Sequence, residues 1–258
     1  MNAKLPFLIT VPHGGRQIPK ELKGRIALSE KGIFDDSDSY TDEIYNLGHL
    51  VKMCLIFGIA RPFVDAGRAT SQLPPQNADG LIKSHTCYKE QVYHTGMEPD
   101  ERLTQLLVDK YYKPFHAQIS QAIQSDQPIF GFDCHSMAEF GTPVSPDPGN
   151  KRPIINLGNR FNLTCAENHM HTLATCFQEV FHLKAGEISL NKPFSGGFIT
   201  QNYGNSPTPF IQIEINRKLY LNKMWFNPAK LEVAPKRIME LNIMMGRVLT
   251  MFHERFCY

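Results

Sequence analysis

The sequence predicts an α/β fold in which helices cover both faces of a mixed, mostly parallel β-sheet. Short apolar runs rich in β-branched residues alternate with longer segments of helical periodicity, as expected for such a three-layer αβα architecture. Polar residues follow several of these runs, and ligands in open α/β folds bind outside the carboxyl ends of the strands. With 258 residues, 42% of them hydrophobic, the chain is long enough for one domain over residues 1–258.

The apolar runs mark the expected strands. Pro12 and the pair Gly14-Gly15 stop the first run. The expected strands are residues 7–11, a segment within 55–64 that ends near Asp65, and residues 128–133, 153–157 and 209–215. The segment 128–133 would deliver His135 just beyond its end. Two stretches rich in Pro, Gly and Asn, 71–80 and 141–153, are expected to be loops.

Helical periodicity predicts four helices. Pro114 is expected to kink or interrupt the second, because proline lacks the amide hydrogen that a helix interior needs. The expected helices are residues 38–51, 99–125, 163–181 and 228–255.

Composition excludes several classes of partner and location. The formal net charge is +2 with scattered Lys and Arg, so charge does not support binding to nucleic acid, to an anionic membrane or to strongly acidic partners, although a small anionic substrate can still be recognised. The N-terminus lacks a signal peptide and no run approaches the ~18 apolar residues of a membrane span, which predicts a cytoplasmic protein. No cysteine pair has Cys-x-x-Cys spacing, and most are expected to be small buried hydrophobes: Cys54, Cys87, Cys134, Cys165, Cys176 and Cys257.

Two histidines at strand ends suggest a metal site. His13 follows the first strand and precedes two glycines, and His135 lies in Asp-Cys-His-Ser after the strand 128–133. Each histidine alone is more often structural, but two at the carboxyl ends of strands in one sheet can converge on one ion. A catalytic zinc requires three protein ligands and an open position, so a third ligand is needed. Asp133 and Ser136 would supply the hydrogen bonds that fix a ligand's tautomer.

The third ligand is expected from the acidic segment 35–43. Asp and Ser before a helix also act as ordinary N-caps, which is the competing interpretation. Asp38, or failing that Asp36 or Asp42, would complete a His-Asp-His site.

Glu214 is the candidate general base. Alternation along residues 210–216 puts three isoleucines on one face of the strand and Gln212, Glu214 and Asn216 on the other. A buried carboxylate there requires a cation, a metal-activated water or a hydrogen-bond partner. The alternative is an edge strand with a solvated polar face.

Two further segments are candidate substrate-binding loops, although each can equally be a plain turn. Arg68 ends the segment 64–68 and suits a planar carboxylate. The segment 195–200 offers backbone amides at Gly196 and Gly197, followed by Thr200. His-Gly-Gly also occurs in esterase-type hydrolases, but the Gly-x-Ser-x-Gly motif that these require is absent from the sequence.

Taken together, these motifs resemble the N-formylglutamate amidohydrolase family, in the same order and over nearly the whole chain. The matching segments are Val-Pro-His-Gly-Gly (11–15), Asp-Ser-Asp (36–38), Thr-Asp-Glu-Ile-Tyr (41–45), Val-Asp-x-x-Arg (64–68), Asp-Cys-His-Ser (133–136), Phe-x-Gly-Gly-Phe-Ile-Thr (194–200) and Gln-Ile-Glu-Ile-Asn-Arg-x-Leu-Tyr (212–220). Each motif is weak alone, but the set is fairly specific.

The resemblance implies a fold like that of zinc carboxypeptidases and the hydrolysis of an N-formyl or N-acyl amino acid. By motif position it implies Zn²⁺ held by His13, Asp38 and His135. It implies Glu214 as base and Arg68 as binder of a substrate carboxylate. In the mechanism expected from these roles, the metal and an arginine, Arg68 or Arg217, would stabilise the oxyanion. The substrate-binding set is Arg68, Gly196, Gly197, Thr200, Asn216 and Arg217.

One segment departs from the family's pattern. The family commonly shows Asp-x-Asn-Arg-Pro-Pro where this chain has Asp-Ala-Gly-Arg-Ala-Thr at 65–70. The departure leaves the hydrolytic chemistry intact and puts N-formylglutamate itself in doubt as the substrate. The alternatives are a carboxypeptidase- or deacylase-type zinc hydrolase acting on another small amide, and a non-catalytic small-molecule-binding relative.

Overall fold

Six strands form one mixed sheet in the computed structural model, which describes residues 3–204 and 207–256. In spatial order the strands are β2 (Val51–Ile56), β1 (Leu5–Val11), β3 (Phe130–Met137), β6 (Phe210–Asn216), β4 (Ile155–Gly158) and β5 (Ile188–Leu190). Neighbouring strands are parallel except at the β4–β6 pair, which is antiparallel. The predicted fold class, an α/β protein with a mixed, mostly parallel sheet, is confirmed.

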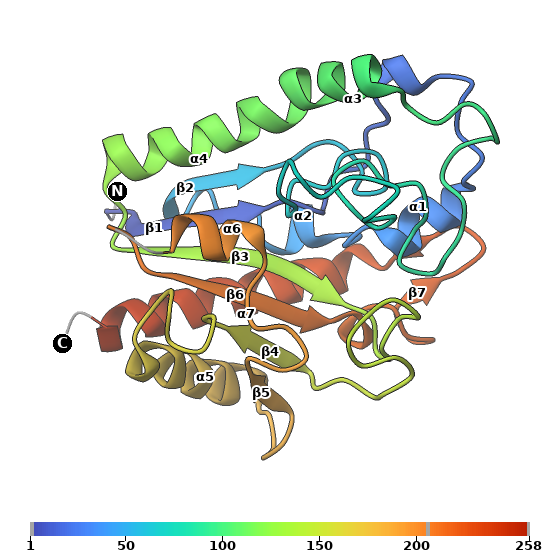
Figure 1. Cartoon of the computed structure of the whole chain (residues 1–258). Helices are drawn as coiled ribbons and strands as arrows, with labels where there is room; N and C mark the ends of the chain where they lie inside the picture. Colours follow the sequence, from blue (N-terminus) through green and yellow to red (C-terminus); the bar gives the residue numbers. More distant parts are fainter. Residues whose placement is uncertain (1–2, 205–206, 257–258) are drawn as a thin grey trace.

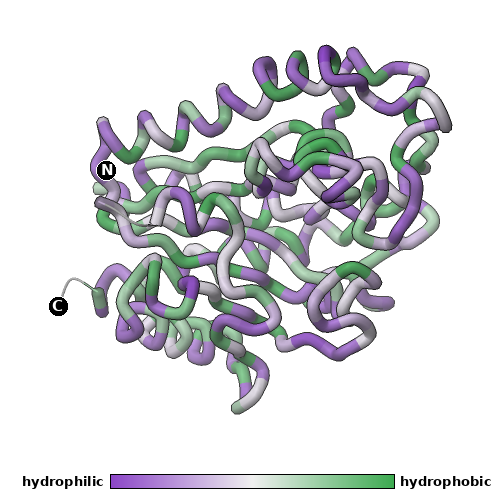
Figure 2. The backbone as a smooth tube through the Cα atoms, in the orientation of Figure 1, coloured by the Kyte–Doolittle hydropathy of each residue, from purple (hydrophilic) through white to green (hydrophobic). Residues whose placement is uncertain are grey.

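Helices cover both faces of this sheet (Figure 1). On one face lie α3 (Glu101–Leu107), α4 (Lys113–Asp126) and the short α6 (Phe198–Tyr203). Of these helices, α4 contacts β1 and β2, and α6 contacts β3 and β6. On the other face, α5 (Glu167–Phe181) and α7 (Pro235–Phe256) pack against each other and the sheet. Figure 2 shows hydrophobic residues concentrated in the central strands, whereas α3 and α4 alternate hydrophilic with hydrophobic positions.

Smaller elements complete the chain. They are η1 (Lys20–Leu22), α1 (Glu30–Asp36), α2 (Thr41–Ile44), η2 (Val108–Tyr112), η3 (Arg217–Leu219) and the hairpin of β7 (Phe226–Asn227) with β8 (Glu232–Val233). Among the described residues, no helix is both long and apolar enough to cross a membrane. The predicted cytoplasmic location stays a prediction.

Two expected elements are wrong. The helix expected over 38–51 is limited to α2, and Val51 is already the first residue of β2. The helical spacing of Ile44, Leu47 and Val51 misleads, because all three are buried although only Ile44 lies in a helix. The strand expected within 55–64 ends at Ile56, and the apolar residues after it pack as a loop against α4. The hydrophobicity of residues 57–64 reflects their burial in the cluster beneath α4 and does not indicate a strand.

The remaining expected elements occur with shifted bounds. The helix over 99–125 is split by the π-helical turn η2 just before Pro114, as the missing proline amide leads one to expect. The helices expected over 163–181 and 228–255 begin later, at Glu167 and Pro235. The strand expected over 128–133 extends to Met137, so His135 lies inside β3 rather than after it. Of the cysteines, Cys87, Cys134, Cys165 and Cys176 are buried and Cys54 is partly buried, whereas Cys257 lies outside the described residues.

Candidate active site

One face of the two central strands carries the candidate site. β3 and β6 pair in parallel register, which places His135 opposite Glu214 and Asp133 opposite Gln212. All four side chains are buried. The alternative of a solvated edge strand is wrong, because β6 lies between β3 and β4 in the interior of the sheet. The buried polar face therefore has to be satisfied by partners from the loops and α6 above it.

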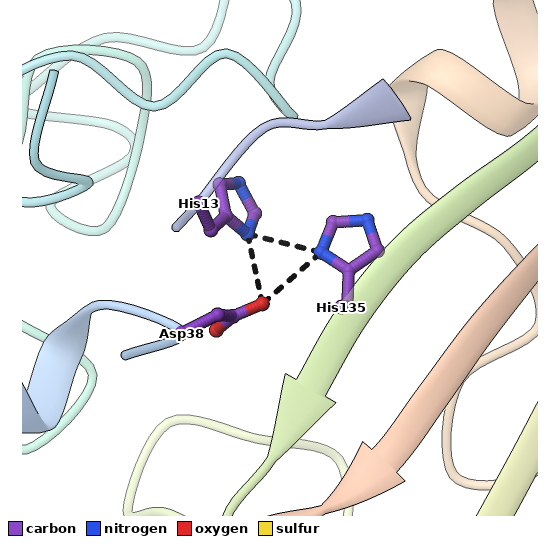
Figure 3. A group of neighbouring side chains, drawn as sticks. All are labelled: His13, Asp38 and His135. Atoms are coloured by element: carbon purple, nitrogen blue, oxygen red, sulfur yellow. Dashed lines mark hydrogen bonds and ion pairs between the residues drawn. The ribbon is translucent and has the colours of Figure 1, made fainter. Parts of the chain in front are cut away.

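Three side chains from different segments converge on one point (Figure 3). The Nδ1 atoms of His13 and His135 lie 3.1 Å apart. The Oδ2 atom of Asp38 lies 3.5 Å from Nδ1 of His13 and 3.3 Å from Nδ1 of His135. Tetrahedral ligands at zinc bond lengths of about 2.0–2.1 Å would be about 3.3 Å apart. The spacing and chemistry of these three atoms fit a cation that has tetrahedral coordination and bond lengths in this range. Such a cation would accept the lone pairs of all three atoms, which face one another.

Asp65 fixes the orientation of His13. Its Oδ1 atom lies 2.7 Å from Nε2 of His13 and accepts a hydrogen bond at 2.9 Å from the amide of Gly67. A carboxylate can only accept, so Nε2 carries the hydrogen and Nδ1 keeps a free lone pair. Burial would raise the pKa of Asp65, but its close contact with His13 and the charge of Arg61 hold it well below its ordinary value.

Sequence reasoning missed this role of Asp65, although it singled out the segment that contains the residue. Gly67 matters for the same contact, because a Cβ atom there would lie 2.7 Å from Nε2 of His13. Gly67 stands where the family's pattern has asparagine. In this chain the loop at Gly67 runs so close to His13 that it leaves no room for a side chain.

Asp133 lies beside the outer nitrogen of His135, as predicted. Its Oδ1 atom is 3.1 Å from Nε2 of His135, although that nitrogen lacks a well-aligned hydrogen-bond partner among the described residues. Thr200 donates to Oδ2 at 2.9 Å and Thr10 to Oδ1 at 3.2 Å. Thr200, expected to bind substrate, is fully buried and holds this carboxylate in place.

Asp38 is held by Arg217 and by the backbone of β3. Its Oδ1 atom accepts from Nη2 of Arg217 at 2.8 Å, and its Oδ2 atom accepts from the amide of Ser136 at 3.1 Å. Burial would raise the pKa of Asp38, but the adjacent imidazoles of His13 and His135 and the charge of Arg217 hold the pKa well below its ordinary value. Ser136, expected beside a histidine, instead accepts from Nε of Arg217 at 3.0 Å.

The other two candidates for third ligand lie elsewhere. Asp36 is fully buried and pairs with Lys83, with Oδ2 and Nζ 2.9 Å apart. Asp42 pairs with Arg16 at 3.3 Å. Of the three candidate aspartates, only Asp38 lies within ligand distance of both histidines.

Glu214 shares the buried face with this cluster. Its Oε1 atom accepts from Nε2 of Gln212 at 2.7 Å. Burial raises the pKa of Glu214 to about 7, opposed by the neighbouring His135 and assisted by the charge of Asp38. A carboxyl group with a pKa near neutrality can both accept and return a proton.

A cavity of about 340 Å³ opens onto Glu214 and the three converging side chains. Four arginines line it, and each pairs with a carboxylate: Arg61 with Asp65, Arg68 with Asp79, Arg152 with Asp147, and Arg217 with Asp38. The buried Arg152 was not among the predicted site residues, because it lies in the Pro- and Gly-rich segment 141–153 and follows no expected strand.

The expected substrate-binding residues divide between the cavity and its surroundings. Arg68, Gly197 and Arg217 line the cavity. Gly196 lies in a neighbouring groove, and the buried Asn216 hydrogen-bonds the carbonyl of Pro153 outside the cavity lining. Arg217 donates to Asp38, to Ser136 and, at 2.7 Å, to the carbonyl of Asp35, so its donors are committed to the protein.

The fold and site thus define an α/β protein with a buried His-Asp-His cluster, able to hold a metal ion, beside a carboxyl group. The model of the N-formylglutamate amidohydrolase family matches residues 5–221. The chain therefore belongs to the N-formylglutamate amidohydrolase family, a family of hydrolases. No curated protein sequence matches the chain.

Solved structures share the fold at low sequence identity. An N-formylglutamate amidohydrolase from Ralstonia eutropha JMP134 aligns with a TM-score of 0.76 and 18% identity, over 99% of this chain and 96% of that chain. A gene product of Agrobacterium tumefaciens aligns with a TM-score of 0.60 and 15% identity, over 99% and 93% of the two chains. A metallo-carboxypeptidase from Burkholderia cenocepacia aligns with a TM-score of 0.38 and 12% identity, over 99% and 58%, a similarity too low to establish a common fold.

Proposed function

We propose that the protein is a zinc-dependent amidohydrolase that cleaves an N-formyl or other N-acyl amino acid into a carboxylic acid and the free amino acid. The observation that carries the proposal is the tetrahedral spacing of the His13, Asp38 and His135 donor atoms beside buried Glu214. Family membership supports the amide as the bond that is cleaved. We also infer that residues 1–258 form one catalytic domain, because both hydrophobic clusters pack on the same sheet.

Each protein group has a role in this hydrolysis. A zinc ion bound by the three side chains would supply Lewis-acid polarisation and make water a better nucleophile at neutral pH. Glu214 takes a proton from the attacking water, whose oxygen forms a bond to the amide carbon. Glu214 then passes the proton to the amine nitrogen as the carbon–nitrogen bond breaks.

Arg68 is the proposed binder of the substrate carboxylate. Its Nη2 atom donates to Asp79 at 3.0 Å, and its side chain is 33% exposed. Asp79 also contacts the buried Lys83, so it keeps a cationic partner when Arg68 turns toward a substrate. Arg217 instead acts through Asp38, since its donors are already taken.

The test is hydrolysis by the zinc-loaded protein. N-formyl-L-glutamate, N-acetyl-L-glutamate and a dipeptide are incubated with the protein, and the released amino acid is measured by chromatography, with a chelator-treated sample as control. We expect zinc-dependent release from at least one formyl or acetyl substrate. Release from the dipeptide alone would indicate a peptidase, and no release from any substrate would contradict the proposal.

A further inference from the structure

Lys83 is a fully buried lysine in the long connection between β2 and α3. Lysine is almost never fully buried without partners, because its ammonium group is strongly hydrated in water. Here the Nζ atom lies 2.9 Å from Oδ2 of Asp36 and 3.7 Å from Oδ2 of Asp65, and it also contacts Asp79. One side chain therefore joins three segments of the chain.

The three carboxylates keep Lys83 charged. Burial and the nearby charge of Arg61 would lower the pKa of Lys83, but Asp36, Asp79 and Asp65 raise it above its ordinary value. Burial would likewise raise the pKa of Asp36, but Lys83 and Arg61 lower it to about 2. The contact between Lys83 and Asp36 is thus an ion pair inside the protein, where loss of one partner leaves the other uncompensated.

Two of the three carboxylates hold residues of the candidate metal site in place. Asp65 orients His13 through its other oxygen, Oδ1, at 2.7 Å. Asp36 ends α1 two residues before Asp38, and its own Oδ1 atom accepts from the amide of Cys87 at 2.8 Å. The side chain of Asp36 therefore anchors the backbone from which Asp38 reaches the histidines.

The third carboxylate leads away from the metal site. Asp79 accepts from Nη2 of Arg68 at 3.0 Å, and Arg68 belongs to the cavity lining and not to the three converging side chains. An effect of Lys83 that passes through Asp36 and Asp65 should reach a bound metal, whereas an effect that passes through Asp79 should not.

We propose that Lys83 is a positioning residue for the metal site. Its ammonium group holds Asp36 and Asp65 so that Asp38 and His13 already face His135 at ligand spacing when a metal ion arrives. This inference rests on the proposed zinc-dependent function for the identity of the site. Charge alone predicts the opposite effect, because removal of a cation near the site would strengthen the binding of a dication. Weaker metal binding without Lys83 would therefore indicate positioning.

The test is the zinc affinity of K83M, measured by competition with a chromogenic chelator. Methionine is also a long, unbranched side chain, and it removes the charge. We expect K83M to bind zinc about 10- to 100-fold more weakly than wild type, the usual range for groups that support a metal-bound histidine. D79N, which removes the third contact of Lys83, should bind zinc nearly as wild type does. K110M, at a lysine paired with Glu21, is the matched control and should bind zinc as wild type does.

Zinc binding by K83M as tight as in wild type, or tighter, would overturn the inference. A loss in D79N as large as that in K83M would also overturn it. If K83M does not fold, the double variant K83M/D36N takes its place, because it removes one charge of each sign from the buried cluster. We expect this variant to bind zinc at least about 10-fold more weakly than wild type. Wild-type affinity in the double variant would contradict the role of Lys83.

If wild-type protein binds no zinc, the proposed zinc-dependent function fails, and hydrogen exchange of the metal-free protein decides the role of Lys83 by itself. We expect K83M to exchange its amide hydrogens faster than wild type over residues 34–42 and 63–68. Exchange over residues 141–153, a loop closed by its own pair of Arg152 with Asp147, should not change. Unchanged exchange in the first two segments, or an equal increase in all three, would overturn the inference.

Discussion

The face of the sheet beneath α5 and α7 is apolar, whereas the face beneath α4 and α6 carries the candidate site, although the same strands build both. In β3, Phe130, Phe132 and Cys134 point to the first face and Asp133 and His135 to the second. On the apolar face the rings of Phe7 and Phe132 lie 5.2 Å apart in a T-shaped arrangement, as do those of Phe130 and Phe252. Aromatic packing of this kind stabilises the fold without any polar group to satisfy.

The polar face has the opposite balance. Its charged side chains are costly to bury and persist because each has a partner, as Asp133 has in Thr10 and Thr200. Adjacent residues of one strand should therefore respond differently to mutation, with stability lost on one face and activity on the other.

The largest effect is expected for Glu214→Gln. The amide keeps the shape of the side chain and can still accept from Gln212, so zinc content and the unfolding midpoint should not fall. Loss of the base should lower kcat by about 10²- to 10⁴-fold. Steady-state kinetics with parallel metal analysis measures this. Near-normal turnover would remove Glu214 from the role of base.

The neighbouring Ile213, on the apolar face, should show the reverse. Ile213→Ala leaves a cavity in a fully buried cluster and should lower the free energy of unfolding by about 2–5 kcal/mol. The conservative Ile213→Val should cost only about 0.5–1.5 kcal/mol. Denaturant titration measures both, and kcat per folded protein should stay near that of wild type. A large loss of kcat with no loss of stability would contradict the assignment of the apolar face to stability and of the polar face to activity.

A smaller effect is expected for Asp133→Asn, which weakens the partner that orients His135. Changes to groups that hydrogen-bond a metal-bound histidine commonly reduce metal affinity by about 10- to 100-fold. Competition with a chromogenic zinc chelator measures the affinity. Asp42→Asn, at an aspartate paired with Arg16 outside the cluster, is the matched control. Equal zinc affinities for both variants would contradict the proposed role of Asp133.

The smallest effect concerns His116 of α4, which helps hold the loop of Asp65 over the polar face. Its Nε2 atom lies 3.0 Å from the carbonyl of Ala66, and Nδ1 lies 2.9 Å from the hydroxyl of Tyr203. Burial lowers the pKa of His116 from 6.5 to about 4. The unfolded chain thus binds a proton between these values that the folded chain does not, so this contribution to stability is present above pH 6.5 and is lost as the pH falls.

His116→Gln should therefore flatten the fall in stability between pH 6.5 and pH 4, by about 1–3 kcal/mol. Thermal unfolding across this range measures the difference. His94→Gln, at an exposed histidine, should leave the slope of wild type unchanged. An equal slope in wild type and His116→Gln would indicate that His116 is protonated in the folded protein.

Alternation made part of this division predictable. Isoleucines at every second position from 211 to 215 predicted a strand with Glu214 on the opposite face, and β6 has that form. Periodicity failed where apolar residues pack without regular structure. Phe63 and Val64 were expected in a strand because they are apolar. Both are fully buried, but they lie in a loop beyond the end of β2.

Contacts distant in the chain explain what else was missed. Asp65 meets His13 across 52 positions, and Arg217 meets Asp38 across 179, separations at which local patterns carry no information. Residue type indicated which side chains can bind a metal or transfer a proton, whereas the tertiary fold decides which of these side chains come into contact.

The most direct test of the central claim is a crystal structure of the zinc-loaded protein with anomalous data collected at the zinc edge. We expect one strong peak about 2.0–2.1 Å from Nδ1 of His13, Nδ1 of His135 and Oδ2 of Asp38, with Glu214 facing the open position. A peak held by other side chains, or no peak at this cluster in crystals soaked with zinc, would contradict it.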